Sequence, residues 1–355
     1  MEKRELKKKA FWAGVSLLLA ILSIRAVMSL GSGITFDQVR ELIATANPVF
    51  LVLALLGMTG FLYFEGAAVR CFLLPMGYPA GRRKAFLYAC ADNYFSAITP
   101  SATGGQPACA LFMMRDGIPL ATTTAILLMN SLFYTLAVLI NGLFCIVVGA
   151  AMGVLQHFST FSHILITIGA LTLSGISLSA VLLLWNQSLL WRIANRIFSL
   201  LEKLHLMRHP EIRKAKLELL MKQYRECVDL MAEKKRMLVG AFVLNLLQRL
   251  SQISVTLSIY MALGGQAKNL FRLYLTQSMC VVGSNCVPIP GSMGVTDYLM
   301  VDGFMPIMGS DMAYRVELFA RSTAFYICMI VSGLVVLGGF IFLKAKKKEG
   351  DNPSL

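Results

Sequence analysis

Long apolar runs dominate this sequence and decide what it can fold into. Six of them have about the twenty residues that an α-helix needs to cross roughly 30 Å of hydrocarbon. Only 15% of the 355 residues are charged and 57% are hydrophobic, whereas soluble domains carry about a quarter charged residues. The sequence therefore predicts an all-α polytopic membrane protein. The six expected full spans are residues 10–30, 48–70, 118–149, 162–185, 237–262 and 315–343.

The first apolar run follows a basic stretch, residues 1–9, so a cleaved signal peptide is the alternative to a membrane span. The run has the length of a full span and lacks a clear small-x-small cleavage site. We therefore expect residues 10–30 to form a retained helix.

Two further apolar regions, 85–114 and 273–308, are interrupted near their middle by proline and glycine. Neither half is long enough to span comfortably, so each region is expected to form a re-entrant, or broken, helical hairpin. A helix break in hydrocarbon leaves N–H and C=O groups that must be satisfied by protein or by a water-filled cavity. The two breaks are therefore the candidate binding sites. Kinked, packed helices whose hydroxyl groups bond to the backbone are the alternative.

The first break is rich in polar side chains and glycines. Gly104 and Gly105 would let a ligand approach the backbone closely, and a helix beginning near Pro107 would point free N–H groups at the break. This pattern predicts an anion cradle suited to a lipid phosphate. Asp92 is the leading single candidate, because an ionisable side chain at this depth is costly. The candidate binding residues here are Asp92, Asn93, Thr99, Ser101, Thr103, Gly104, Gly105 and Gln106.

The second break and three arginines complete the candidate site. The binding residues expected at the second break are Asn285, Pro290, Gly291, Gly294 and Asp297. An anionic headgroup that crosses the bilayer needs cations along its path, and Arg70, Arg249 and Arg321 would supply them. Glu65 and Arg70 lie near one expected membrane boundary, and Glu317 and Arg321, four residues apart, lie near the other. For these four residues, anchoring at the boundary or a local ion pair is the alternative. Arg249 shares a polar stripe of its span with Asn245 and Gln248.

A shift of 190 residues relates the two interrupted regions. It places Pro100 on Pro290 and Gly104 on Gly294, and it carries the second expected span onto the fifth. If each hairpin returns to its side of entry, the two units run in opposite directions through the membrane. The sequence thus predicts an inverted repeat, the internal symmetry of many secondary transporters with midplane sites.

The basic residues are distributed unevenly along the chain. By this topology 26 of the 33 Lys and Arg residues fall on one side, in residues 1–9, 70–84, 115, 186–236 and 344–355. The positive-inside rule then predicts a multi-pass cell-membrane protein with both termini in the cytoplasm. The expected divisions are a first membrane repeat with the following span (1–185), a cytoplasmic segment (186–236), a second membrane repeat (237–343) and a cytoplasmic tail (344–355).

Residues 186–236 form the one sizeable segment expected outside the membrane. Apolar residues recur there at helical spacing from Leu217 to Met231, with basic residues between them. A basic amphipathic helix lying on an anionic lipid surface explains this pattern. RNA binding is the alternative, but the segment has no aromatic platform or recognisable module, so a nucleic-acid partner is not expected.

No catalytic residue, metal site or cofactor is expected. The eight cysteines are scattered, mostly inside apolar runs, without a paired spacing. His205 and His209 are four residues apart, but no cluster of acidic or thiolate ligands accompanies them. We interpret the cysteines as small hydrophobic residues and the histidines as part of a solvated helix face.

Two motifs carry a resemblance to a known family. Residues 93–107 (NYFSAITPSATGGQP) and 287–294 (VPIPGSMG) resemble the amino-terminal membrane region of lysylphosphatidylglycerol synthases, the multiple peptide resistance factors. They are also similar to stand-alone flippase-like membrane proteins that share this domain. The resemblance covers nearly the whole chain. It implies a flippase that moves aminoacylated phosphatidylglycerol to the outer leaflet and so contributes to resistance against cationic antimicrobial peptides.

The sequence departs from the family pattern in two respects. The second family motif more often reads Pro-Gly-Gly-x-Gly followed by an acidic residue, whereas here Ser292 replaces a glycine and Asp297 follows Gly294 by three residues. The bifunctional members continue into a soluble synthetase domain that uses aminoacyl-tRNA, whereas this sequence ends at Leu355, directly after a basic tail. We therefore expect lipid translocation, not enzymatic activity, from this chain alone.

Two alternatives to a translocase stay open. One is a phosphatidylglycerol lysyltransferase-related protein that acts in lipid metabolism with a separate synthetase. The other is a membrane scaffold for such an enzyme. The expected partners are a membrane phospholipid as substrate, an anionic lipid surface bound through residues 186–236, a separate synthetase, and a second copy of the chain.

Overall fold

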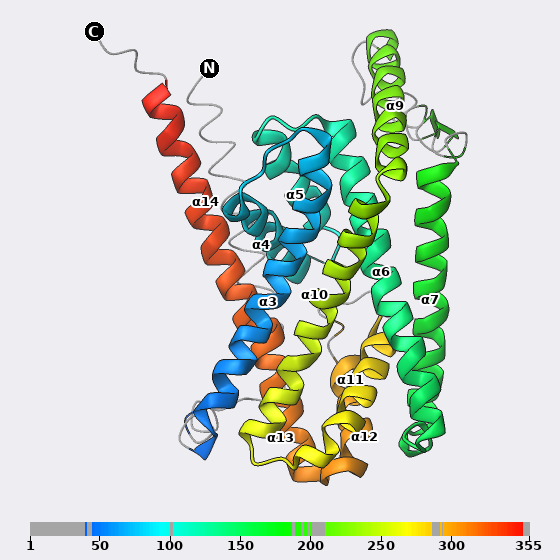
Figure 1. Ribbon diagram of the computed structural model, residues 1–355, viewed down its shortest axis with the longest axis vertical. Coiled ribbons are helices and arrows are strands. Elements are labelled where there is room, and N and C mark those ends of the chain that lie inside the picture. The colour runs from blue at the N-terminus through cyan, green and yellow to red at the C-terminus, as the bar shows by residue number, and fades with distance from the viewer. Residues whose placement is uncertain are drawn as a thin grey trace.

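The computed structural model describes residues 40, 45–99, 102–186, 189, 191, 192, 195, 196, 199, 210–285, 292 and 294–350. Every regular element in these residues is a helix (Figure 1), which confirms the all-helical prediction. Five helices in this part of the chain are long and apolar enough to cross a membrane, and they coincide with the spans expected from residue 48 onward. The first expected span, residues 10–30, lies outside the described residues.

Five long helices run along the long axis of the described chain. They are α3 (Pro48–Leu73), α6 (Leu120–Ala151), α7 (Thr160–Trp185), α10 (Lys235–Ala262) and α14 (Cys328–Gly350). α13 (Ser310–Arg321) leads into α14 through a π-helical turn at Ser322–Ile327. α3 starts at Pro48 because Asn47 caps it, with Oδ1 accepting a hydrogen bond from Val49 N at 3.0 Å.

Four shorter helices of the described chain form two pairs. The first pair is α4 (Arg82–Ile98) and α5 (Gly105–Arg115), and the second is α11 (Leu270–Ser284) and α12 (Val295–Met308). They contain 17, 11, 15 and 14 residues, so at about 1.5 Å per residue none reaches across roughly 30 Å of hydrocarbon. The helices of each pair are separate, as the predicted breaks require, and α5 begins at Gly105, two residues before Pro107. The pairs lie in opposite halves of the molecule (Figure 1).

The helix order repeats within the described chain. α3, α4, α5 and α6 begin at residues 48, 82, 105 and 120, and α10, α11, α12 and α13 begin at residues 235, 270, 295 and 310. The starts of α5 and α6 are therefore offset from those of α12 and α13 by the expected 190 residues. The chain runs in opposite directions along α3 and α10, which pack against each other near the centre of the molecule (Figure 1).

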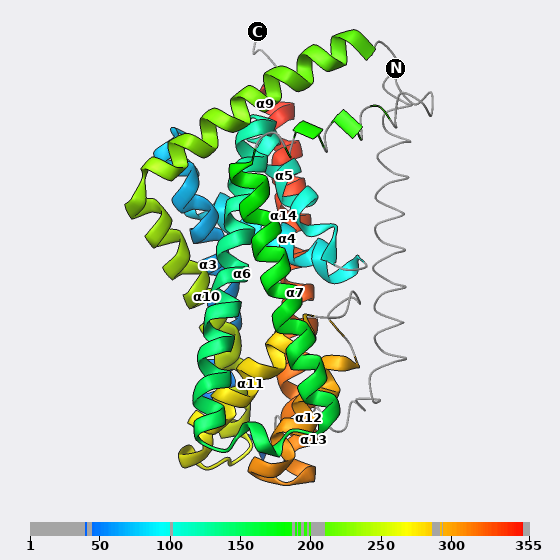
Figure 2. The same cartoon turned by 90° about the vertical axis from the view of Figure 1, so that its right-hand side faces the viewer.

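α9 (Pro210–Glu233) crosses the end of the molecule at which α14 also ends (Figure 2). It packs against α6, and Tyr224, Val228 and Met231 on its apolar face are buried. The Tyr224 hydroxyl donates a hydrogen bond to the Leu183 carbonyl at 3.4 Å, and burial raises the pKa of Tyr224 to about 12. Protein contacts thus hold the second half of α9. Binding of residues 186–236 to an anionic lipid surface stays a prediction.

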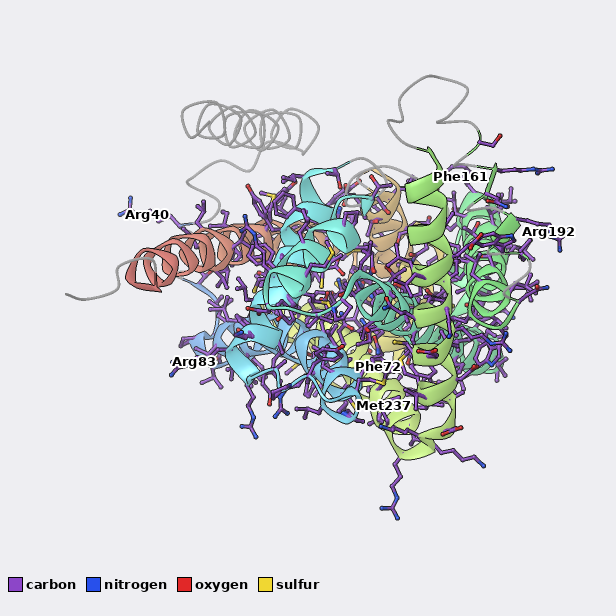
Figure 3. All side chains as sticks on the ribbon, turned by 90° about the horizontal axis from the view of Figure 1, so that it is seen from above. Arg40, Phe72, Arg83, Phe161, Arg192 and Met237 are labelled. Carbon is purple, nitrogen blue, oxygen red and sulfur yellow. The ribbon has the colours of Figure 1, made fainter. Side chains whose placement is uncertain are left out.

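Apolar side chains fill the interior and also cover the outside. Seen from above (Figure 3), side chains occupy the space between the helices, and Phe72 and Met237 are among the buried ones. The Phe72 ring stacks on Phe133 of α6 with 6.0 Å between the ring centroids. On the outer faces Val49, Leu171 and other large apolar side chains are more than half exposed. An apolar outer surface of this extent fits a chain that lies in lipid.

Candidate functional site

Asp92 is the centre of the polar groups at the first break. Its Oδ1 accepts a hydrogen bond from Ser96 Oγ at 3.1 Å, and its Oδ2 accepts one from Gln106 Nε2 of α5 at 3.3 Å. A Cβ at Gly105 would overlap the oxygens of Asp92 and Ser96, so only glycine lets α5 begin this close to α4. The structure therefore brings three of the predicted residues, Asp92, Gly105 and Gln106, into one cluster.

The Asp92 carboxylate lies against the first turn of α5, where the helix dipole is positive. Beside it, Gly104 N donates a hydrogen bond to Thr99 Oγ1 at 2.9 Å, and that hydroxyl donates to the Phe95 carbonyl at 2.6 Å. Groups of the protein itself thus occupy part of the predicted anion cradle. A phosphate could reach these N–H groups only if Asp92 moved away or lost its charge.

The other residues predicted at the breaks have separate surroundings. Asn93 faces α14, where Cys328 Sγ donates to its Oδ1 at 3.1 Å. Thr103 is exposed in the turn before α5. Asn285 is exposed at the end of α11, and its Nδ2 donates to a backbone carbonyl one turn earlier at 2.6 Å. The predicted residues outside the described part of the chain are Ser101, Pro290 and Gly291.

Asp297 organises the second break. Gly294 precedes α12 with a φ of 79°, a backbone conformation that favours glycine. Gly294 N donates to Asp297 Oδ2 at 2.8 Å, so Asp297 caps α12. Arg321 Nε donates to Asp297 Oδ1 at 2.7 Å and ties α13 to α12. Arg321 therefore forms an ion pair with Asp297 of α12, a partner that the sequence did not indicate.

We expect Asp297→Ala to destabilise the protein by about 1–2 kcal/mol, because it removes a helix cap and a partly buried ion pair together. The midpoint of thermal unfolding in detergent measures this change. Asp311→Ala is the matched control, since it removes the exposed Asp311–Arg315 pair of α13, and exposed pairs contribute about 0–1 kcal/mol. Equal losses in the two variants would contradict the capping role of Asp297.

A layer of buried polar side chains crosses the centre of the helix bundle. On α10 it contains Asn245, Gln248 and Arg249, which the sequence placed on one stripe. Asn245 Nδ2 donates to Asn130 Oδ1 of α6 at 3.1 Å, and Gln248 Nε2 donates to Glu65 Oε2 of α3 at 3.2 Å. Three buried atoms of this turn, Asn245 Oδ1, Gln248 Oε1 and Arg249 Nε, have no hydrogen-bond partner within the described chain. Such groups are costly and mark a functional candidate.

Arg249 is a buried cation, with 3% of its surface exposed. Its guanidinium donates hydrogen bonds to Gln252 and to the Tyr134 hydroxyl and lies 5.0 Å from the centroid of the Tyr134 ring. Among the described residues no carboxylate lies within ion-pair distance of it. A buried guanidinium without a counter-charge is strongly unfavourable, so Arg249 is suited to meet an anion from outside the protein.

Both breaks and the buried polar layer lie within the part of the chain that matches a known protein family. The family described as "Lysylphosphatidylglycerol synthase TM region" matches residues 12–332. The chain belongs to this family. The last part of α14 lies beyond the matched region. No curated protein and no solved structure matches the chain. Family membership gives this chain a lipid-related role in a membrane.

The three predicted arginines do not form one cluster in this family member. Arg70 is partly exposed near the end of α3, and its Nε donates to the Ala80 carbonyl at 2.9 Å, which closes the turn before α4. Arg321 pairs with Asp297 at the second break, and Arg249 lies in the central polar layer. The arginines therefore mark three separate places along the protein.

Sequence reasoning missed several polar residues that the structure makes central. Glu65 was interpreted as a boundary residue, but it is 8% exposed and faces α10. Asp302 of α12 accepts hydrogen bonds from Ser159 N at 2.9 Å and Ser162 Oγ at 2.5 Å, so it fastens α12 to the start of α7. Asn130 and Tyr134, four residues apart on α6, were a usable signal, because this spacing places two polar groups on one face of an apolar helix.

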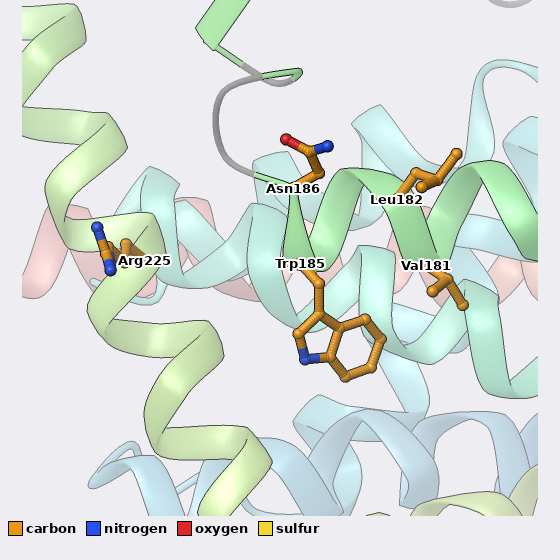
Figure 4. A pocket seen from close by; sticks show the side chains of 5 residues that line it. All are labelled: Val181, Leu182, Trp185, Asn186 and Arg225. Carbon is orange, nitrogen blue, oxygen red and sulfur yellow. The ribbon is translucent and has the colours of Figure 1, made fainter.

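A shallow hollow lies away from both breaks, between the end of α7 and α9 (Figure 4). Its lining combines apolar side chains of α7 with the guanidinium of α9, and Trp185 and Arg225 are exposed there. The lining residues are Val181, Leu182, Trp185, Asn186 and Arg225. A tryptophan and an arginine at the end of a candidate span are typical of a membrane boundary.

Proposed function

We propose that this chain is a phospholipid translocase, a flippase that moves an anionic or aminoacylated phospholipid such as lysylphosphatidylglycerol between leaflets. One observation carries the proposal. Two pairs of half-length helices, α4–α5 and α11–α12, lie in opposite halves of the molecule within two oppositely directed sets of helices (Figure 1). Transporters use this arrangement to build midplane sites from broken helices. Movement of lysylphosphatidylglycerol outward would contribute to resistance against cationic antimicrobial peptides.

In this proposal the two pairs enter the membrane as re-entrant hairpins and receive the lipid headgroup at their breaks. The amino ends of α5 and α12 each meet a carboxylate of the protein, Asp92 and Asp297. A headgroup with an ammonium and a phosphate could exchange with these internal pairings. Its phosphate could take the place of a carboxylate at the amino end of α5 or beside Arg321, and its ammonium could pair with the carboxylate that is displaced. The phosphate could also pair with Arg249, which has no carboxylate partner among the described residues. The acyl chains would stay in lipid, since only the headgroup needs a polar path.

The distribution of charge supports a cytoplasmic position for the end that carries α9 and the last residues of α14. The described residues at this end include a basic group at the start of α10, Lys234, Lys235 and Arg236, and a basic run from Lys344 to Lys348. The positive-inside rule places such an end on the cytoplasmic side of a cell membrane. The hairpin α4–α5 then enters from the cytoplasm and α11–α12 from the opposite side.

Leaflet exchange in liposomes tests the proposal. The purified chain is reconstituted with labelled phosphatidylglycerol or its lysyl ester, and exchange is followed by quenching of the outer-leaflet label. We expect faster exchange than in empty liposomes, and slower exchange with Asp92→Asn and with Gly104→Leu, because a side chain at Gly104 would meet Thr99 Cγ2 at 2.6 Å. Gly81→Leu is the matched control, since a Cβ there meets nothing within 4 Å. Equal rates with and without the protein would refute the translocase.

A role beside a separate synthetase is the second candidate, and the family description favours it because it names a synthase. The exposed basic face of α9, with Arg225 and Lys222, would be the docking surface for such an enzyme. Incubation of this chain alone with lysyl-tRNA and phosphatidylglycerol is expected to yield no lysyl lipid. Formation of lysyl lipid would mean that the chain itself is a transferase.

A further inference from the structure

Two carboxylates from neighbouring helices lie inside the first half of the protein. Glu65 of α3 is 8% exposed, and Asp92 of α4 is partly exposed at the first break. α3 packs against α4, and the two side chains are close enough for the charge of Asp92 to act on Glu65. We call Glu65 and Asp92 the acid pair.

Hydrogen bonds to the acid pair come from neutral groups. Glu65 Oε2 accepts from Gln248 Nε2 at 3.2 Å, and Asp92 accepts from Ser96 Oγ at 3.1 Å and Gln106 Nε2 at 3.3 Å. In the part of the chain that the structure describes, no Lys, Arg or His forms an ion pair with either carboxylate. Two ionised carboxylates that are close together and removed from water repel each other and lose hydration, so this arrangement favours the binding of a proton.

Among the described residues, the surroundings of Glu65 offer no compensating cation. Three thiols on the adjacent helices lie within reach of its charge: Cys90 on α4, Cys109 on α5 and Cys328 on α14. On α10, Arg249 follows Gln248 but directs its guanidinium to Tyr134 and Gln252. On α3 itself, Arg70 bonds to the backbone of the turn before α4. α6 contributes the neutral amide of Asn130 to the same layer.

We propose that the acid pair is a proton-binding site and that lipid translocation is coupled to proton movement through it. Asp92, which is partly exposed at the break, takes a proton from hydronium and leaves water, so one O–H bond breaks and one forms. The proton then passes between the carboxylates as one O–H bond breaks and another forms, and it returns to water by the reverse step. Chains of carboxylates serve as proton relays in membrane pumps and transporters.

Protonation of Asp92 has a consequence at the first break. The ionised carboxylate is attracted by the amino end of α5, against which it lies. A neutral Asp92 loses most of that attraction, so the first turn of α5 can accept a phosphate instead. Proton binding and phosphate binding would therefore favour each other at this break, which links the proton site to the headgroup.

Infrared spectroscopy of the full chain in lipid nanodiscs tests the proton site without any transport. We expect the C=O stretching band of a protonated carboxyl at neutral pH, and we expect Glu65→Gln to remove or shift it. Glu226→Gln, which changes an exposed carboxylate of α9, is the control and should leave the band unchanged. Absence of the band from the unsubstituted protein, or its persistence unshifted in both Glu65→Gln and Asp92→Asn, would overturn the proton site.

Leaflet exchange under a pH difference tests the coupling, which rests on the proposed translocase. A difference of about one pH unit changes the protonated fraction of a single site by up to roughly tenfold. We therefore expect the exchange rate to depend on which side of the membrane is more acidic. In Glu65→Gln the response should disappear. An exchange rate that does not change with the pH difference in the unsubstituted protein would overturn the coupling. A carboxyl band without any lipid exchange would refute the translocase and leave the proton site standing.

Discussion

Arg249→Met is expected to make the protein more stable and less active. Arg249 is 3% exposed and has no carboxylate partner among the described residues. Methionine keeps the length and packing of the side chain but removes the buried charge, so we expect a gain of about 1–2 kcal/mol in the free energy of unfolding. If the guanidinium receives the lipid phosphate, leaflet exchange should fall at least roughly tenfold, equivalent to about 1.4 kcal/mol of barrier.

The opposite signs of the two effects separate a functional cation from a structural one. A structural arginine would lower stability when it is replaced, through lost hydrogen bonds to Tyr134 and Gln252. Arg236→Met, at the exposed start of the same helix, is the matched control and should change neither the midpoint of thermal unfolding nor the exchange rate. A less stable Arg249→Met protein that retains full exchange would show that the polar layer only supports packing.

Gly169→Val is expected to cause the largest loss of stability of any single substitution proposed for this protein. A Cβ at Gly169 of α7 would overlap the Val282 carbonyl of α11 and would come within 2.9 Å of Gly283 Cα. Backbone atoms cannot move aside as a flexible side chain can, so we expect a cost of about 3 kcal/mol. The substitution would push α11 away from α7 at the end of α11 that leads into the second break.

Gly175→Val on the same helix is the control for this substitution. A Cβ at Gly175 meets nothing within 4 Å, and substitution there is expected to change the free energy of unfolding by no more than about 0.5 kcal/mol. Thermal unfolding of both variants in one detergent gives the comparison. Similar midpoints for Gly169→Val and Gly175→Val would mean that α7 does not set the position of α11.

The sequence alone located most of the architecture. Apolar run length marks spans directly, because the bilayer fixes how many residues a helix needs, and five expected spans coincide with long helices. Proline and glycine marked the two breaks, since these residues end helices. The shift of 190 residues anticipated the starts of α12 and α13. α5 begins at Gly105, two residues before Pro107, and the missing Cβ of Gly105 lets this turn lie against Asp92.

The candidate site was predicted only in part. Asp92, Gly105 and Gln106 come together because they are close in the sequence and a hairpin must bring its two halves side by side. The partner of Arg321 was not foreseen as Asp297, which lies 24 residues away on another helix. Glu65 was expected at a membrane boundary because of its position along the predicted span. The sequence did not show that its side chain faces α10.

Sequence by itself therefore determined the class, the number and length of the apolar helices after residue 48, and the places where they break. Only the tertiary structure decided which polar groups meet, such as Glu65 with Gln248 and Asn245 with Asn130. The physical reason lies in the solvent. A helix in lipid is apolar both toward its neighbours and toward the membrane, so its sequence encodes its length strongly and the direction of its packing face weakly.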